Sequence, residues 1–279
     1  MSVAMLSTVA PSSFDFLAEL VLRKSAIVLE PSKQYLVESR LLPIARAHGW
    51  STLDELVVGL KKPGAATLVD EVIDAMTTNE SSFFRDLHPF NALRSHILPE
   101  LIAKRGKERV LNIWSNACSS GQEVYSIAML IRENFPELAG WKVSLTATDI
   151  SKQILDKAQS GIFTQTEINR GLPMPLVIKN FKREGVHWRI NEDIRKMVNF
   201  RLLNLIEPWP VTLPKMDIVF LRNVLIYFNV ETKKQILDKI HRVMHSDGVL
   251  FLGGAETTMN LNVKFDRRPF GAATGYFPT

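Results

Sequence analysis

The feature that most limits the fold is an alternation of short apolar runs with helical segments, which begins at residue 110. Strands are expected at 110–114, 143–148, 216–221 and 248–253, with helices at 122–134, 151–158 and 231–244 between them. Such alternation indicates a parallel sheet with helices on both faces, a doubly wound α/β fold. Ligands of these sheets bind beyond the carboxyl ends of the strands. The loops that follow the strands are therefore the first place to look for a site.

The residues before this alternation have apolar side chains at helical spacing and no strand pattern. Pro43 should kink or limit the second of these helices, which ends at Gly49. The predicted divisions are a flexible tail at 1–13, an all-helical domain at 14–76, a linker at 77–90 and the α/β domain at 91–279.

Residues 173–203 interrupt the α/β alternation. Two apolar stretches, 186–190 and 197–202, flank the polar Asn191-Glu192-Asp193. This pattern predicts antiparallel strands. They would form an inserted hairpin or a three-stranded subdomain, and the last strand could instead rejoin the main sheet.

Composition restricts the class of protein. Hydrophobic residues make up 46% and charged residues 23% of the 279 residues, as in ordinary globular proteins. Apolar runs are too short to cross a bilayer and no signal-peptide pattern precedes them, so we expect a cytoplasmic protein without membrane insertion. The single cysteine, Cys118, excludes an intrachain disulfide. His241 and His245 lie four apart on an expected helix, but with no third ligand we expect no metal site.

Charge is distributed unevenly along the chain. The formal net charge is +5, composed of −3 in residues 1–80 and +8 in residues 81–279. A basic surface suggests an acidic partner, either nucleic acid or protein.

Two segments that follow expected strands have the character of a nucleoside site. Residues 114–123 form a strand, a loop of small residues and a helix, and Gly121 allows a ligand close to the backbone. Neither a G-x-G-x-x-G pattern nor a P-loop is present, which favours a ligand without phosphate contacts; a plain strand-turn-helix is the alternative. Asp149 ends the next strand and could accept ribose hydroxyls or, with Ser151, cap the following helix.

Two further segments combine polar and aromatic residues. Residues 77–85 could lie over a pocket, or could be a linker in which Ser81 or Ser82 caps a helix. In residues 220–228 a strand ends in Arg-Asn and Tyr227 follows; the alternative is a structural loop with a buried tyrosine.

Together these segments resemble the CheR chemotaxis receptor methyltransferases. Thr-Thr-Asn-x-x-x-Phe-Phe-Arg at 77–85 and Arg-Asn-Val-x-Ile-Tyr-Phe at 222–228 are specific, and the resemblance covers about residues 14–277. It implies a Rossmann-like class I methyltransferase domain with S-adenosyl-L-methionine as cofactor and S-adenosyl-L-homocysteine as product. It also implies methylation of glutamate side chains on chemoreceptors, which is the chemistry of sensory adaptation.

The resemblance assigns roles residue by residue. The cofactor-binding residues would be Asn79, Ser81, Arg85, Glu123, Asp149, Asn204, Leu205, Arg222 and Asn223. Arg85 and Tyr227 would act at the reacting groups, Arg85 by pairing with the carboxylate of either the substrate or the cofactor. The family's Gly-His-Ser-Glu is Gly253-Gly254-Ala255-Glu256 here, so no role of that histidine or serine is carried over.

Partners follow from the same resemblance. Lys33, Arg40 and Arg46 would meet the acidic methylation helices of a receptor; a solvated helix face is the alternative. The insertion, basic overall, could add a receptor C-terminal tether to a strand edge, and a regulatory protein could dock on the helical domain. The competing functions are a nucleic-acid methyltransferase, for which no base-flipping motif or nucleic-acid-binding module is found, and a non-catalytic cofactor-binding scaffold.

Overall fold

The structure, a computed structural model, describes residues 9–279 and divides into two compact units. One unit contains the residues up to Thr78 together with Tyr227–Asn229, and the other contains Asn79–Ile226 and Val230–Thr279. None of the helices within 9–279 is both long enough and apolar enough to cross a membrane.

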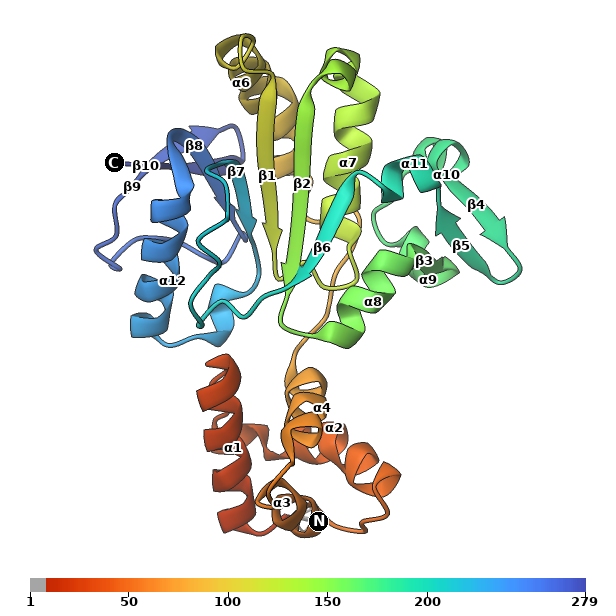
Figure 1. The fold of residues 1–279 in the computed structure, drawn as a ribbon, viewed down its shortest axis with the longest axis vertical. Coiled ribbons are helices and arrows are strands. Elements are labelled where there is room, and N and C mark those ends of the chain that lie inside the picture. The colour runs from red at the N-terminus through yellow and green to blue at the C-terminus, as the bar shows by residue number, and fades with distance from the viewer. Residues whose placement is uncertain (1–8) are drawn as a thin grey trace, which may run out of the picture. The chain divides into compact units, whose positions relative to one another are not determined.

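The first unit is helical, as expected. Its elements are α1 (Pro11–Ser25), η1 (Pro31–Lys33), α2 (Gln34–Ala47), α3 (Leu53–Leu60) and α4 (Ala66–Met76) (Figure 1). Helix α1 begins inside the expected tail, whose residues 1–8 lie outside the described part of the chain. Pro43 lies within α2, which continues to Ala47.

Local chemistry and packing explain these helices. Thr52 accepts a hydrogen bond from the Glu55 amide while the Glu55 carboxylate accepts from the Thr52 amide, a capping box that begins α3. The most deeply buried large residues in the core of the unit include Leu17, Val21, Val37, Leu41, Leu53, Leu56 and Val72. Arg40 of α2 donates to the carbonyls of Met76 and Thr77, both at 2.9 Å, and so holds the end of α4.

The second unit contains a seven-stranded sheet. Its spatial order is β6 (Val198–Leu202), β2 (Lys142–Asp149), β1 (Val110–Asn116), β7 (Met216–Leu221), β8 (Met244–Leu252), β10 (Ala273–Pro278) and β9 (Phe265–Phe270). The first five strands are parallel, and β10 and β9 are antiparallel. This confirms the doubly wound α/β fold; the final antiparallel pair had no counterpart in the sequence prediction.

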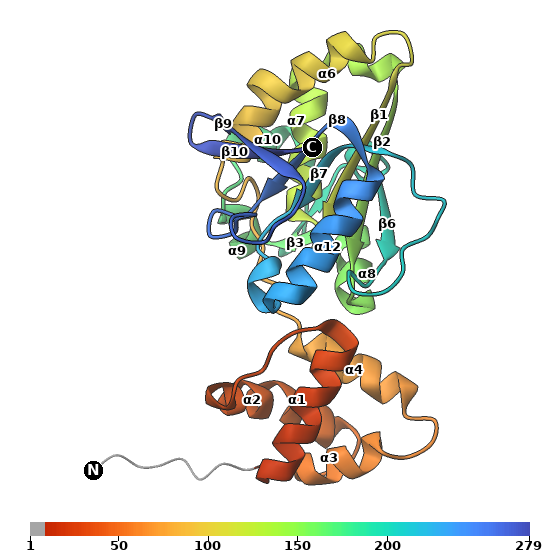
Figure 2. The same cartoon turned by 90° about the vertical axis from the view of Figure 1, so that its left-hand side faces the viewer.

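Helices cover both faces of this sheet. The helical segments in this part of the chain, those of the inserted subdomain included, are α5 (His88–Ala92), η2 (Leu93–Ile97), α6 (Leu98–Lys104), α7 (Gln122–Asn134), η3 (Pro136–Gly140), α8 (Lys152–Ser160), α9 (Gln165–Asn169), α10 (Met174–Asn180), α11 (Glu192–Arg195), η4 (Leu225–Tyr227) and α12 (Val230–Val243). Figure 2 shows α6 and α7 on one face and α12 on the other. His241 is on α12 but His245 is on β8, so the expectation that they share a helix is wrong.

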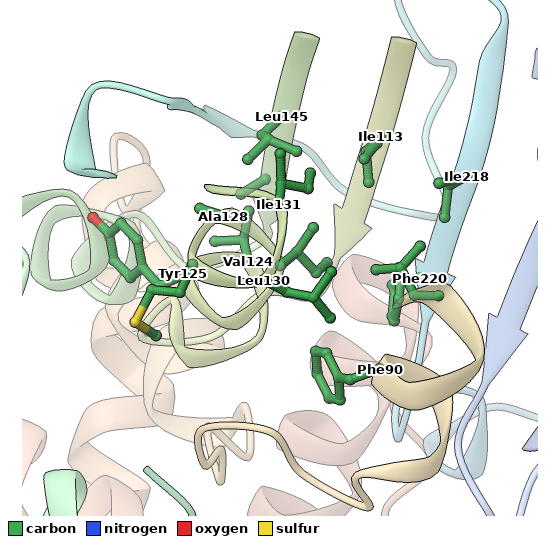
Figure 3. Packing of buried hydrophobic residues seen from close by; sticks show 14 of the residues in the cluster. Phe90, Ile113, Val124, Tyr125, Ala128, Leu130, Ile131, Leu145, Ile218 and Phe220 are labelled. Carbon is green, nitrogen blue, oxygen red and sulfur yellow. The ribbon is translucent and has the colours of Figure 1, made fainter. Parts of the chain in front are cut away.

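Alternate residues of the strands build the core. Ile113, Ile218 and Phe220 belong to the cluster formed with α7 and Phe90 (Figure 3). Trp114, the neighbour of Ile113, is fully buried outside that cluster. The central strands β1 and β7 thus bury apolar side chains on both faces, which is typical of a sheet covered on both sides.

The inserted antiparallel subdomain is present, but its pairing differs from the prediction. Strands β3 (Ile162–Thr164), β5 (His187–Ile190) and β4 (Phe181–Glu184) form a separate sheet. The expected pairing of 186–190 with 197–202 is wrong, whereas the alternative, that the last strand rejoins the main sheet, is confirmed: β6 pairs with β2 in parallel. The hairpin turn lies at Gly185-Val186, where φ of Gly185 is +60°. The expected bounds, 173–203, therefore omit β3 and include β6.

Candidate active site

The site lies where the order of the strands reverses. From β1 the chain continues toward β2 and β6 on one side, and from β7 toward β8 on the other. Asn116 is level with Thr148 on one neighbouring strand and with Leu221 on the other. The loops after β1, β2, β6 and β7 therefore leave the sheet at one edge (Figure 1). Such a reversal point is the usual ligand crevice of an open α/β sheet.

The loop from β1 to α7 has an unusual backbone. Ala117 and Ser119 have φ of 48° and 51°, and Gly121 has φ of 90°. A Cβ on Gly121 would lie 3.1 Å from the ring of Tyr125, so this position requires glycine both for conformation and for space. The loop is further held by the Cys118 amide, which donates to the Thr148 carbonyl at 3.0 Å.

Asp149 ties the loops after β1 and β2 together. One carboxylate oxygen accepts from the Ser119 amide at 2.9 Å and the other from the Ser151 amide at 3.0 Å. Ser151, not Asp149, caps α8, by accepting from the Ile154 amide. Asp149 is buried, with 6% of its surface exposed. Of the two interpretations drawn from sequence, the cap therefore belongs to Ser151 alone.

Arg222 joins three segments at the end of β7. It donates to the Glu123 carboxylate at 2.8 Å and to the Asp86 carboxylate at 2.7 Å. It also donates to the Arg85 carbonyl at 2.9 Å. Only 1% of its side chain is exposed. Glu123 in turn accepts from the Ser115 hydroxyl at 2.8 Å. Glu123 of α7, the segment Arg85-Asp86 and Arg222 after β7 therefore form one hydrogen-bonded network.

The segment after Asn79 lies against this network. The Asn79 carbonyl accepts from the Ser119 hydroxyl at 2.8 Å, and the Phe84 amide donates to the Ser126 hydroxyl at 2.9 Å. Helix α5 begins after Leu87 without a side-chain cap, so neither Ser81 nor Ser82 caps it. Ser81 is half-buried.

Arg85 is half-buried in the same segment. Its Nη1 donates to the Glu80 carbonyl at 3.1 Å. Among residues 9–279 its other guanidinium nitrogens have no hydrogen-bond partner. The remaining N–H groups of this planar guanidinium can therefore pair with a carboxylate.

Backbone strain concentrates in these loops. Of the ten non-glycine residues described with positive φ, six lie in the segments just named: Phe84, Asp86, Leu87, Ala117, Ser119 and Asn223. Conformations of this kind cost free energy and collect at functional sites. The clustering thus marks this edge of the sheet independently of any motif.

Glu256 is a site residue that sequence reasoning missed. Its carboxylate accepts from four backbone amides, those of Asn223, Val224, Leu225 and Gly253, at 2.7–2.9 Å. It thereby fixes the loop that begins with Arg222 and Asn223. The Gly253-Gly254-Ala255-Glu256 sequence after a strand was its only signal.

A second missed residue is Asn116, the last of β1. Its side-chain oxygen is buried and has no hydrogen-bond partner within residues 9–279. Buried acceptors are nearly always paired, so this oxygen fits a donor group of a ligand.

The structure brings most of the expected residues to this edge. Asn204 and Leu205 follow β6, where the Leu203 amide donates to the Asp149 carbonyl at 2.9 Å. Tyr227 lies in η4, after the β7 loop, and clusters with the helical unit, where its carbonyl accepts from the Val28 amide at 3.2 Å. Its role at the reacting groups stays a prediction.

Comparison with known proteins decides the family. Residues 12–77 match the family described as CheR methyltransferase, all-alpha domain, and residues 79–272 match CheR methyltransferase, SAM binding domain. The chain belongs to the CheR methyltransferases. It is therefore a methyltransferase whose cofactor is S-adenosylmethionine.

Named relatives agree with this assignment. The chain is 41% identical to "Chemotaxis protein methyltransferase 1" of Pseudomonas aeruginosa, over 90% of this chain and 92% of that protein. It is 41% identical to "Chemotaxis protein methyltransferase Cher2" of Pseudomonas putida, over 84% and 86%. It is 37% identical to "Chemotaxis protein methyltransferase 1" of Vibrio cholerae, over 93% and 94%.

Proposed function

We propose that this protein transfers a methyl group to glutamate side chains of chemoreceptors and so forms methyl esters in sensory adaptation. The observation that carries the proposal is the likeness, over nine-tenths of both chains, to a protein named for chemotaxis methylation. Bound S-adenosylmethionine supplies a methyl group on a positively charged sulfur.

The donor set of the site fits this cofactor. Asp149 would accept ribose hydroxyls in addition to its two amides, and the unpaired Asn116 oxygen would accept a further donor. Asn79, Glu123, Asn204 and Leu205 would line the same edge. The left-handed backbone at Gly121, where an added Cβ would crowd Tyr125 and Ala158, would present the main chain of this loop to the ligand.

The chemistry of the acceptor explains what the site does not need. A glutamate side chain is ionised at neutral pH, with an ordinary pKa of about 4.3, and requires no strong base. The Cys118 thiol is no candidate nucleophile, because burial raises its pKa well above the ordinary value. What an ionised acceptor needs is orientation, which the guanidinium of Arg85 would provide.

Receptor recognition would use other surfaces. Lys33 and Arg46 of the helical unit are exposed, whereas the Arg40 guanidinium is engaged at the end of α4. We therefore assign docking on acidic receptor helices to Lys33 and Arg46 rather than Arg40. In the small sheet, β4 is an edge strand to which a receptor tether could add.

Transfer of label from radioactive S-adenosylmethionine to a purified receptor cytoplasmic fragment tests the proposal. Mild base should release the label as methanol, and a fragment without its methylatable glutamates should take up none. Base-stable label, or label on RNA or DNA but not on receptor, would indicate a different acceptor. Cofactor binding without any transfer would indicate a scaffold.

Arg85→Ala sharpens the assay. We expect about a tenfold to hundredfold loss of turnover, because a charged hydrogen-bonding pair to the acceptor or cofactor is lost. Arg109→Ala is the matched control, since Arg109 is exposed before β1 at the other end of the sheet. A raised KM for receptor alone would assign Arg85 to the substrate, and a raised KM for cofactor alone would assign it to the cofactor.

A further inference from the structure

The segment between β6 and β7 has neither helix nor strand, although it begins with two cofactor-site residues. Residues 203–215 leave β6 at Asn204 and Leu205 and cross toward α12 (Figure 1). A loop of this length needs anchors to hold its first residues still, because backbone freedom is costly to lose.

Lys239 of α12 supplies such an anchor. Its ammonium donates to the Leu205 carbonyl at 2.5 Å and to the Glu207 carbonyl at 3.0 Å. The same nitrogen lies 4.9 Å from the centroid of the Trp209 ring, a cation–π contact. One charged side chain thus contacts three residues of the loop within five positions.

The anchored loop is also packed against the sheet. The Trp209 ring meets the Trp114 ring of β1 edge-on, with centroids 5.0 Å apart. Trp114 donates from its indole nitrogen to the Thr148 hydroxyl at 3.0 Å, next to Asp149. A continuous set of contacts therefore runs from α12 through the loop to the strand that carries the ribose-binding acid.

We propose that Lys239 is a positioning residue that holds Asn204 and Leu205 in the conformation that binds the cofactor. It touches neither the cofactor nor the acceptor and acts through the carbonyl of Leu205. The inference rests on that part of the proposed function which places the cofactor at Asn204 and Leu205. It is independent of whether the acceptor is a receptor glutamate.

The environment of the ammonium supports a specific role. Burial lowers the pKa of Lys239, and the nearby Glu207 carboxylate opposes that shift. A lysine held in a partly desolvated position between two carbonyls and a ring is more restrained than a solvated one.

Calorimetric titration of the full chain with S-adenosylhomocysteine tests the proposal. Lys239→Met should weaken binding about tenfold, which is about 1.4 kcal/mol and close to one charged hydrogen bond. Lys239→Gln, polar but uncharged and shorter, should weaken it at least about threefold. Lys107→Met, an exposed lysine before β1, has the same charge change and should leave affinity unchanged.

Two further readouts separate positioning from a general loss of stability. Lys239→Met should raise KM for the cofactor and leave kcat at saturation unchanged, whereas partial unfolding would lower kcat instead. Amide exchange should accelerate in residues 203–209 and not in the helices. Either Lys239 variant binding with wild-type affinity, or slow exchange in 203–209, overturns the proposal.

Asn204→Ala shows whether a negative result concerns only the role of Lys239 or the placement of the cofactor at residues 204 and 205 as well. If Asn204→Ala binds S-adenosylhomocysteine normally, the placement of the cofactor at this segment is wrong and the role of Lys239 falls with it. If Asn204→Ala binds weakly and Lys239→Gln binds normally, only the role of Lys239 is wrong.

Discussion

Two arginines of the α/β unit each join two carboxylates, at opposite ends of the parallel strands. At the carboxyl end, Arg222 donates to Glu123 and Asp86. At the amino end, Arg105 donates to Asp217 at 3.0 Å and to Asp247 at 2.6 Å. The residue types and distances are alike, yet only one of the two networks lies among the candidate site residues.

The difference lies in the surroundings of each network. At the amino end the Asp217 carboxylate of β7 also accepts from the Asn112 amide of β1 at 2.8 Å. This network therefore binds to the backbone of the sheet and, within residues 9–279, to no loop of the candidate site. A cavity of about 640 Å³ adjoins it, lined in part by Glu108 and His245. At the carboxyl end lie the strained loops and the unpaired Asn116 oxygen. Neither an ion network nor a cavity identifies the site; the reversal of strand order and the strained backbone do.

The largest effects on stability and cofactor affinity are expected when each of the two arginines is exchanged for methionine. Arg222→Met should lower the free energy of unfolding by about 3 kcal/mol, because the largely buried Glu123 carboxylate loses its charged partner; the Asp86 carboxylate, about half exposed, adds little. It should also weaken S-adenosylhomocysteine binding by about tenfold or more, since Glu123 loses a charged partner. Denaturant unfolding and calorimetry measure the two effects.

Arg105→Met is the control for that experiment. It should also destabilise the fold, but affinity should stay within about twofold of wild type because the two ends of the strands are distant and independent. Weak binding by Arg105→Met would mean that the amino-end network also shapes the site. Arg222→Lys keeps the charge and serves if Arg222→Met does not fold.

Two carboxylates that accept backbone amides give the second test. Glu256→Gln replaces one acceptor oxygen by a donor beside four amides, and should lower the free energy of unfolding by about 2–3 kcal/mol. Because the loop at Asn223 is released, S-adenosylhomocysteine affinity should fall as well. Asp217→Asn should destabilise by about 2 kcal/mol without a change in affinity. Equal affinities for both variants would show that Glu256 serves only the fold.

The smallest effect is expected at Asp247. The hydrogen bond from Arg105 lowers the pKa of Asp247, while its partial burial opposes that shift. A carboxyl with a lowered folded pKa stabilises the fold above its unfolded pKa, about 3.9, and loses this effect as the pH falls through the folded value.

Asp247→Asn should therefore cost at most about 1 kcal/mol at pH 7, since a third of this side chain is exposed. The difference from wild type should shrink as the pH falls below about 4. Unfolding curves at pH 7 and pH 3 measure it. A difference that is constant with pH would mean that the contact does not depend on the charge of Asp247.

Much of the fold followed from periodicity in the sequence. The parallel strands, the helices of the first unit and helices α7, α8 and α12 were expected close to their observed bounds, because each buries a regular apolar face. The helices within 88–104 and 165–195 were not predicted. Strands β9 and β10 were missed for different reasons. Most of β9 is exposed and polar, and β10 is short and contains Gly275 and Pro278, so neither gives an alternating apolar pattern. The pairing of β5 was predicted wrongly because its neighbour β4, Phe181–Glu184, is short and largely exposed and gives no strand pattern. Its other partner, β3, ends 23 positions earlier, too far for a local pattern to indicate.

Some residues of the candidate site could likewise be predicted from sequence, and others could not. Residues that stand in specific motifs, such as Arg85 and Arg222, were singled out as candidates from sequence. Glu256 and Lys239 were not, because they act on backbone amides and carbonyls, and a backbone group has no residue identity that a motif could reveal.

Sequence by itself determined the fold class, the two-unit division and the family, since these depend on apolar periodicity and on residues that are close along the chain. Tertiary structure alone decided which charged side chains fix the loops: Arg40 on the end of α4, Glu256 on the β7 loop and Lys239 on the β6 loop. Arg40 and Met76 are 36 residues apart along the chain, Glu256 and Leu225 are 31 apart, and Lys239 and Leu205 are 34 apart. The physical reason is that a charge is directed by the geometry of the folded backbone around it, and only the completed fold creates that geometry.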